Sequence, residues 1–142
     1  MTFNNINFVE NSIEQGGLRT KGVFKQSSEA NPLISIITVV LNGENNLEES
    51  INSLHKQNYK NIEHIVIDGG SSDKTISIIK KYENKIDYWC QKKDKGIYDA
   101  FNTGMKLAKG DYLGFLKIGT AEQASPYITL LANGFNFTVI LW

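Results

Sequence analysis

Continuous apolar runs alternate with helical stripes over residues 33–118. The runs LISIITVVL (33–41) and IEHIVI (62–67) are rich in β-branched residues and lack polar alternation. Such runs are typical of strands that are buried on both faces of a parallel sheet. Two further strands are predicted in IDYWCQ (86–91) and DYLGFLKI (111–118).

Three helices are predicted between these four strands. Apolar residues recur with helical spacing in residues 44–57, in the segment that follows DGGSSD, and in residues 97–108. Ser72 is the predicted N-cap of the second helix, and Gly110 follows the third. The order β-α-β-α-β-α-β predicts an α/β fold with a Rossmann-like parallel sheet and right-handed crossovers.

The two ends of the chain differ from this central part. Residues 1–32 are polar, without sustained periodicity, and we predict a mostly disordered leader. Residues 121–142 hold Asn133-Gly134 between two apolar, β-prone runs, which predicts an apolar hairpin. Such a hairpin either packs on the sheet or promotes aggregation, so self-association through this tail is a further prediction.

Composition excludes several classes of partner. Lys plus Arg and Asp plus Glu both total 15, so no basic excess points to nucleic acid. No stretch approaches the roughly 20 apolar residues of a transmembrane span, and no signal peptide is visible, so we expect a cytoplasmic location.

Cys90 is the only cysteine in the sequence, and neither His55 nor His64 lies in a cluster of possible catalytic or metal-binding partners. We interpret all three residues as structural.

The strongest local signal for chemistry is IVIDGGSSDKT (65–75). A buried strand ends in Asp68, two glycines allow a tight turn, and a helix follows. A carboxylate at a strand end can accept a hydrogen bond from a base N–H or a ribose hydroxyl, while glycines let a flat ring approach the backbone. A helix cap with an Asx-type turn explains the same residues equally well.

A second signal lies in KKDKGIYDAFNTGMKLAKGDY (92–112). Asp94, Lys95 and Gly96 precede a predicted helix, and Asp99 lies in its first turn. Polar residues at a helix start can contact phosphates or sugars. Taken alone, this segment fits a solvated loop and a capped amphipathic helix better. Neither G-x-G-x-x-G nor a Walker lysine loop occurs in the chain.

Together these segments resemble a known family. TVVLNGENNLEESINSLHKQNYKNIEHIVIDGGSSDKT and DKGIYDAFNTGMKLAKGDYLGFL are similar to family 2 glycosyltransferases of the GT-A fold, over about residues 33–116. Within that family the resemblance is to the bacterial branch that builds capsule, O-antigen and other exopolysaccharides. It implies that residues 33–120 form the N-terminal, nucleotide-sugar-binding half of a GT-A domain. Residues 121–142 would be a tail outside the family pattern.

The resemblance also implies an activity. Members transfer a sugar from a nucleotide donor, usually a UDP-sugar, to a saccharide or lipid-linked acceptor with inversion at the anomeric carbon. Such an enzyme would be cytoplasmic, with peripheral association at the inner membrane face. The residues that map onto the family's nucleotide site, with Asp68 at the uracil ring, are Val40, Leu41, Asn42, Asp68, Gly70, Asp94, Lys95, Gly96 and Asp99.

The chain departs from the family pattern at residues 117–120. There the family carries an acidic Asp-x-Asp-type motif that holds Mg²⁺ or Mn²⁺ on the donor diphosphate, whereas this chain reads Lys117, Ile118, Gly119 and Thr120. We therefore predict no metal site, although a metal is expected for the family. Glu122 is the only acid after Asp111, and its context does not mark it as the family's catalytic base, so no catalytic residue is assigned. We hypothesise a premature end, a frameshift near codon 117, or excision from a longer gene.

Three functional hypotheses follow from the sequence. The first is a glycosyltransferase that retains its donor-binding half. The second is a catalytically inactive module that binds a nucleotide sugar without turnover. The third is another α/β class, such as a methyltransferase or a receiver-like domain, because Asp68-Gly69-Gly70 has a faint likeness to methyltransferase glycine turns.

Overall fold

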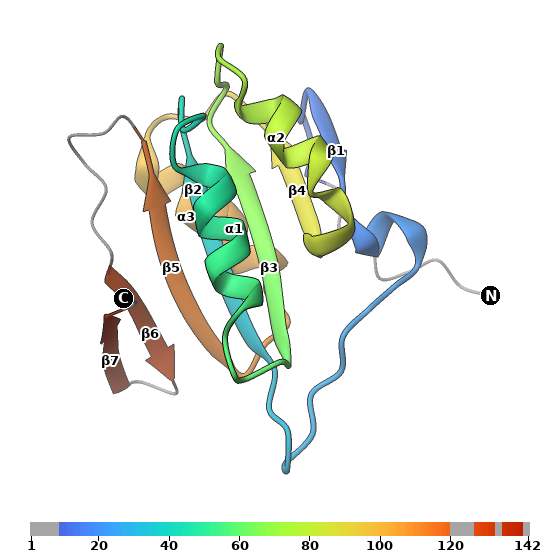
Figure 1. The fold of residues 1–142 in the computed structure, drawn as a ribbon, viewed down its shortest axis with the longest axis vertical. Helices are drawn as coiled ribbons and strands as arrows, with labels where there is room; N and C mark the ends of the chain where they lie inside the picture. Colours follow the sequence, from blue (N-terminus) through green and yellow to red (C-terminus); the bar gives the residue numbers. More distant parts are fainter. Residues whose placement is uncertain (1–8, 120–126, 133–134, 141–142) are drawn as a thin grey trace.

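Strand β2 (Ile34–Val40) lies at the centre of the parallel part of the sheet (Figure 1). It pairs in parallel with β3 (Ile62–Asp68) on one side and with β5 (Tyr112–Ile118) on the other. Strand β3 in turn pairs in parallel with β4 (Tyr88–Gln91). Six of the seven β2 residues are buried, which confirms the strand predicted from the continuous apolar run.

The computed structural model describes residues 9–119, 127–132 and 135–140. In these residues the strands are ordered β1-β4-β3-β2-β5-β6-β7 in one mixed sheet. The remaining elements are β1 (Glu14–Gly16), η1 (Leu18–Lys21), α1 (Leu47–His55), α2 (Thr75–Lys81), η2 (Glu83–Lys85), α3 (Ile97–Leu107), β6 (Tyr127–Ala132) and β7 (Phe135–Ile140). No helix among them has the length and apolarity required to cross a bilayer.

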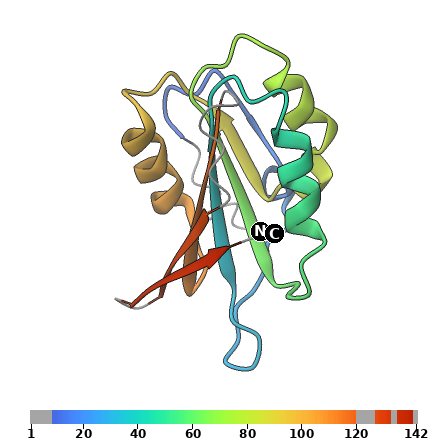
Figure 2. The same cartoon turned by 60° about the vertical axis from the view of Figure 1, so that its left-hand side comes forward.

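The helices cover both faces of the sheet. Figure 2 shows α3 on one face and α1 with α2 on the other. Under α3 the core includes Ile37, Ile65 and Cys90, so the cysteine is a core residue as predicted, and burial raises its pKa to about 12. Gly104 lets α3 approach closely, because a Cβ there would lie 2.3 Å from Cγ2 of Ile37. The opposite core packs helix residues such as Leu47 and Ile79 against the other face of the sheet.

The strand order creates a topological switch point between β2 and β5. Strands β3 and β4 follow on one side of β2, whereas β5 lies on its other side. The crossovers on the two sides of β2 therefore use opposite faces of the sheet. In open α/β sheets ligands bind in the crevice at the carboxyl ends of the strands that flank such a point.

The N-terminal segment is ordered where we predicted disorder. Strand β1 pairs antiparallel with β4, with Glu14 opposite Gln91, which also makes the sheet mixed and not wholly parallel. Arg19 is only 5% exposed. The prediction is therefore wrong for residues 14–21, because a polar segment can be ordered by backbone pairing and by a buried ion pair. Residues 1–8 of the predicted leader lie outside the described residues.

Two ion pairs connect the N-terminal segment to buried carboxylates of the core. The guanidinium of Arg19 pairs with Glu63 on β3, and its Nη1 donates to the carbonyl of Leu107 at 2.8 Å. Lys25 pairs with Asp87 at 2.9 Å, and the same carboxylate accepts the amide of His64 at 2.8 Å. Because Glu63 and Asp87 are almost fully buried, each carboxylate depends on its partner to offset desolvation.

The predicted C-terminal hairpin falls partly outside the described residues, since its turn at residues 133–134 does. In the backbone, β6 pairs antiparallel with both β5 and β7. Self-association through residues 121–142 stays a prediction.

Replacing Arg19 by Ala should lower the free energy of unfolding by about 3 kcal/mol, because it leaves the Glu63 carboxylate buried without its counter-charge. Lys21→Ala, which removes an exposed and long ion pair with Glu83, should cost less than about 1 kcal/mol. Urea denaturation of the two variants measures this difference. Equal, small effects would show that the N-terminal segment is not docked as described.

His64 should make the stability depend on pH. Its side chain is fully enclosed on β3, and burial, followed by the charges of His55 and Lys25, lowers its pKa from 6.5 to about 3. Between these values the unfolded chain binds a proton that the folded chain does not. The free energy of unfolding should therefore fall as pH drops from 6.5 toward 3, with a slope from this group of up to about 1.4 kcal/mol per pH unit. Denaturation of His64→Gln across this range should give a shallower slope, and an unchanged slope would contradict the assignment.

Candidate functional site

A cavity of about 290 Å³ lies at the switch point. Its lining comes from the ends of β2 and β5 and from the start of α3. The lining residues are Val39, Val40, Leu41, Asn42, Asp94, Gly96, Ile97, Ala100, Lys117, Ile118 and Gly119. Five of the nine residues predicted for a nucleotide site are thus brought together.

The loop after β2 forms one wall of this cavity. Leu41 is 51% exposed, and its amide donates to the carbonyl of Ile118 at 3.1 Å. Asn42 takes the left-handed conformation with φ of 50°, which asparagine tolerates better than most residues. At Gly43 a Cβ would lie 2.6 Å from Val40 and 2.8 Å from Ile118. The tight turn thus leaves an apolar side chain at the cavity.

Hydrogen bonds connect this loop to the turn after β3. The Asn42 amide donates to Oγ of Ser71 at 2.8 Å. The Ser71 hydroxyl donates to Oδ1 of Asp68 at 2.5 Å, and the amide of Ser72 donates to Oδ1 of Asn42 at 2.9 Å. Ser71 therefore bridges the ends of the two neighbouring strands.

Asp68 organises the turn that it begins. Its carboxylate is fully buried, and Oδ2 accepts the amides of Gly70 at 3.0 Å and Ser71 at 2.9 Å and the side-chain amide of Gln91 at 3.1 Å. This is the Asx-type turn that the sequence left open as an alternative. Neither Asp68 nor Gly70 lines the cavity, and the contact of Asp68 with a uracil ring stays a prediction.

The start of α2 differs from the prediction. The helix begins at Thr75 and its N-cap position is Lys74, so Ser72 is not the cap. Asp73 instead accepts the amide of Thr75 at 2.9 Å and the amide of Glu44 at 3.2 Å. Burial raises the pKa of Asp73, but hydrogen bonds, chiefly from Thr75, outweigh this effect and lower the pKa overall.

Residues at the start of α3 serve both the helix and the cavity. Oδ1 of Asp94 accepts the amide of Gly96 at 3.0 Å, and Oδ2 of Asp99 accepts the amide of Lys95 at 3.1 Å. Asp94 also lines the cavity, while Lys95 and Asp99 do not. A Cβ on Gly69 would lie 2.8 Å from Oδ2 of Asp94, so the missing side chain lets the turn after β3 lie beside Asp94.

Sequence reasoning missed part of the lining. The sequence does not mark Val39, Ile97 and Ala100 as cavity residues, because an apolar residue at these positions is equally consistent with packing in the core. Lys117, Ile118 and Gly119 were noted only as departures from the family pattern, yet all three line the cavity.

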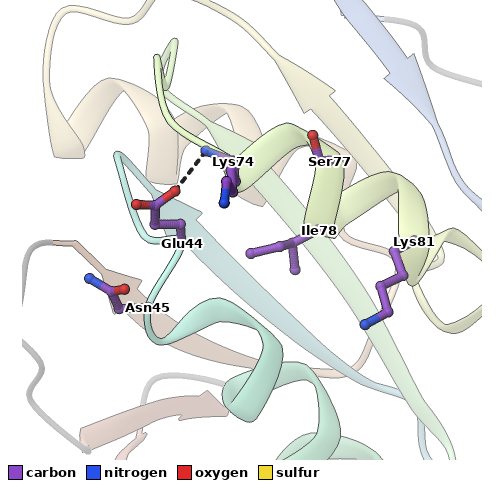
Figure 3. A pocket seen from close by; sticks show the side chains of 6 residues that line it. All are labelled: Glu44, Asn45, Lys74, Ser77, Ile78 and Lys81. Atoms are coloured by element: carbon purple, nitrogen blue, oxygen red, sulfur yellow. Dashed lines mark hydrogen bonds between the residues drawn. The ribbon is translucent and has the colours of Figure 1, made fainter.

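A second surface pocket of about 360 Å³ lies between the loop before α1 and helix α2 (Figure 3). It is lined by Glu44, Asn45, Lys74, Ser77, Ile78 and Lys81. Oε2 of Glu44 accepts the amide of Lys74 at 3.0 Å, and Lys81 pairs with Glu48 at 2.7 Å. None of the predicted site residues lines this pocket.

The residues of the switch-point cavity do not fit a divalent cation. Within the described part of the chain, no group of three His, Cys, Asp or Glu side chains is placed to hold a metal. In the described part of the lining Asp94 is the only acid, and Lys117 contributes a positive charge. Hard cations such as Mg²⁺ and Mn²⁺ require several oxygen ligands.

A mixed sheet with parallel central strands and a cavity at its switch point defines the chain as an α/β protein whose cavity lies where such sheets bind ligands. The family model "Glycosyl transferase family 2" matches residues 35–116, more than half of the chain. The chain belongs to this family. The family predicted from the sequence motifs is thereby confirmed, and the alternative of a methyltransferase or receiver-like domain is wrong.

Curated relatives share this segment. An uncharacterised glycosyltransferase of Mycobacterium tuberculosis is 42% identical over 86 residues, which are 60% of this chain and 33% of that protein. One from Rickettsia typhi is 47% identical over 85 residues, or 60% of this chain and 26% of that protein. The chain thus spans about a third or less of the length of these relatives.

Solved structures show the same fold. TarS residues 1–349 of Staphylococcus aureus, in complex with UDP-GlcNAc, are 31% identical with a TM-score of 0.56, over 60% of this chain and 26% of that chain. The mannosyltransferase PcManGT of Pyrobaculum calidifontis, in complex with GDP-Man and Mn²⁺, has a TM-score of 0.58 over 70% of this chain and 32% of that chain. Its identity of 19% supports likeness of fold alone.

Replacing Ser71 by Ala should lower the free energy of unfolding by about 1–2 kcal/mol, because it removes the acceptor of the Asn42 amide and a donor to Asp68. It should also speed amide hydrogen exchange at Asn42. Ser77→Ala, an exposed change on α2, should alter stability by less than about 0.5 kcal/mol. Exchange at Asn42 as slow as in the unmodified chain would rule out the bridge.

Proposed function

We propose that residues 33–120 bind a nucleotide sugar, and specifically a UDP-sugar, in the cavity at the switch point. The observation that carries this proposal is the cavity itself, where the loop after β2 and the start of α3 converge. Membership of glycosyl transferase family 2 supports it. Further support comes from TarS, a relative at 31% identity whose structure holds UDP-GlcNAc.

The lining residues offer suitable chemistry for the nucleoside part. Leu41 presents half-exposed apolar surface on which a base can pack. The carboxylate of Asp94 keeps Oδ2 for a further acceptor role while Oδ1 holds Gly96, and a ribose hydroxyl is a matching donor. Asp68 would act by fixing the turn beside Asp94, in addition to the uracil contact that the family resemblance implies.

The activity we propose for the whole enzyme is inverting sugar transfer in the synthesis of a bacterial surface polysaccharide, with a saccharide or lipid-linked acceptor. The family assignment supports the class of reaction. The branch of the family, the inverting course, the acceptor, and the cytoplasmic location with peripheral attachment to the inner membrane face rest on the resemblance of the sequence motifs.

A second candidate is a module that binds the nucleotide sugar without turnover. Lys117, Ile118 and Gly119 favour it, because they stand where the family's metal-binding acids begin. Donor hydrolysis or sugar transfer by the purified chain, followed as release of UDP, separates the two candidates. Turnover at a steady rate would remove the second one.

Replacing Leu41 by Ala should weaken UDP binding about fivefold, because it removes the apolar surface that we place under the base. Isothermal titration of the 142-residue chain with UDP measures the change. Val23→Ala removes similarly exposed apolar surface outside the cavity and should leave the affinity unchanged.

The same titration tests the ligand class. UDP and UDP-GlcNAc should bind saturably, and S-adenosylmethionine should not. Failure of both uridine nucleotides to bind would overturn the proposed function, and equal losses in Leu41→Ala and Val23→Ala would place the nucleotide elsewhere.

A further inference from the structure

We infer that this chain holds the diphosphate of its nucleotide ligand with Lys117 and the amino end of α3, without a divalent metal ion. The inference rests on the proposed function and concerns how the same cavity recognises charge. The family is expected to use a divalent metal ion, but the side chains that line this cavity are not suited to bind one.

Lys117 is placed at the cavity by the geometry of β5. Side chains alternate between the two faces of a strand, so Lys117 lies on the same face as Phe115. Phe115 packs edge-to-face against Phe101 of α3, with ring centroids 5.2 Å apart. In the parallel register Lys117 is opposite Val39 of β2, and both residues line the cavity. Lys117 is exposed to solvent.

Helix α3 adds partial positive charge at the same place. It has 11 residues and begins at Ile97, and Gly96, Ile97 and Ala100 from its amino end line the cavity. The amides of Asp99 and Ala100 donate to the carbonyl of Gly96. The amides of Ile97 and Tyr98 have no carbonyl partner within the helix by the geometry of an α-helix, and they carry the positive end of the helix dipole. The preceding amides, of Lys95 and Gly96, are bound by Asp99 and Asp94. An anion at the mouth of this cavity would meet both the helix end and Lys117.

The side chains that line the cavity are poorly suited to bind a divalent cation. Among the lining residues that the structure describes, Asp94 supplies the only carboxylate, and its Oδ1 is occupied by the amide of Gly96. An ammonium group in the same cavity repels Mn²⁺ or Mg²⁺. The negative charge of Asp94 would in turn repel phosphate, so we place the ribose at Asp94 and the phosphates at Lys117.

Titrations of the 142-residue chain with UDP and with uridine, each in excess EDTA and in Mn²⁺, test this inference. The unmodified chain should bind UDP with the same affinity in both buffers. Lys117→Ala should weaken UDP binding about tenfold or more, the size expected for a lost charge-assisted contact, and leave uridine binding unchanged. Lys117→Arg should retain UDP binding. Lys106→Ala, an equal loss of charge at an exposed position in the last turn of α3, should match the unmodified chain.

The outcomes separate this inference from the proposed function. UDP binding that requires Mn²⁺ would overturn the inference and leave the proposed nucleotide site intact. Metal-independent binding that is equal in Lys117→Ala and the unmodified chain would remove Lys117 from the site. Absence of binding by both UDP and uridine would overturn the proposed function and the inference together.

Discussion

The two-sided parallel pairing of β2 is the constraint on which the rest of the structure depends. Because β3 lies on one side and β5 on the other, the strand must be apolar on both faces and covered by helices on both. The same arrangement brings the carboxyl ends of β2 and β5 together at the point where the strand order reverses. The cavity at this point is therefore a consequence of strand order. The residues that line it end or follow β2 and β5, or lie at the start of α3.

Hydrogen bonds convert this crevice into a defined site. Ser71 joins the Asn42 amide to Asp68, and Asp94 holds the amide of Gly96 beside the turn after β3. Each of these side chains caps a turn in the absence of ligand. Structural and binding roles are thus compatible in the same residues, which explains why neither interpretation could be chosen from the sequence.

Most of the fold could be predicted from periodicity. The continuous run before Asn42 identified β2, and the helical stripes identified α1 and α3 to within a few residues. The ordered N-terminal segment could not be predicted in this way. Arg19 and Glu63 are distant in sequence, and the ion pair that they form is recognised only when the fold buries both side chains. The start of α2 was misplaced because Ser72 binds Asn42 across the loops, a contact that local capping rules do not include.

The candidate site was predicted in part. Val40, Leu41 and Asn42 lie at the end of a strand or directly after it, and the family motifs include them, so they were identified. Lys95 and Asp99 lie near Asp94 at the start of α3, but they do not line the cavity. Ile97 and Ala100 were missed since an apolar helix residue gives no sign of whether it faces a core or a ligand.

A crystal structure of the 142-residue chain grown with UDP would show where the nucleotide binds. We expect the nucleotide between the carboxyl ends of β2 and β5, with its base against Leu41 and its diphosphate at Lys117. A nucleotide bound in the pocket between the loop before α1 and helix α2, or at any place remote from the switch point, would contradict it.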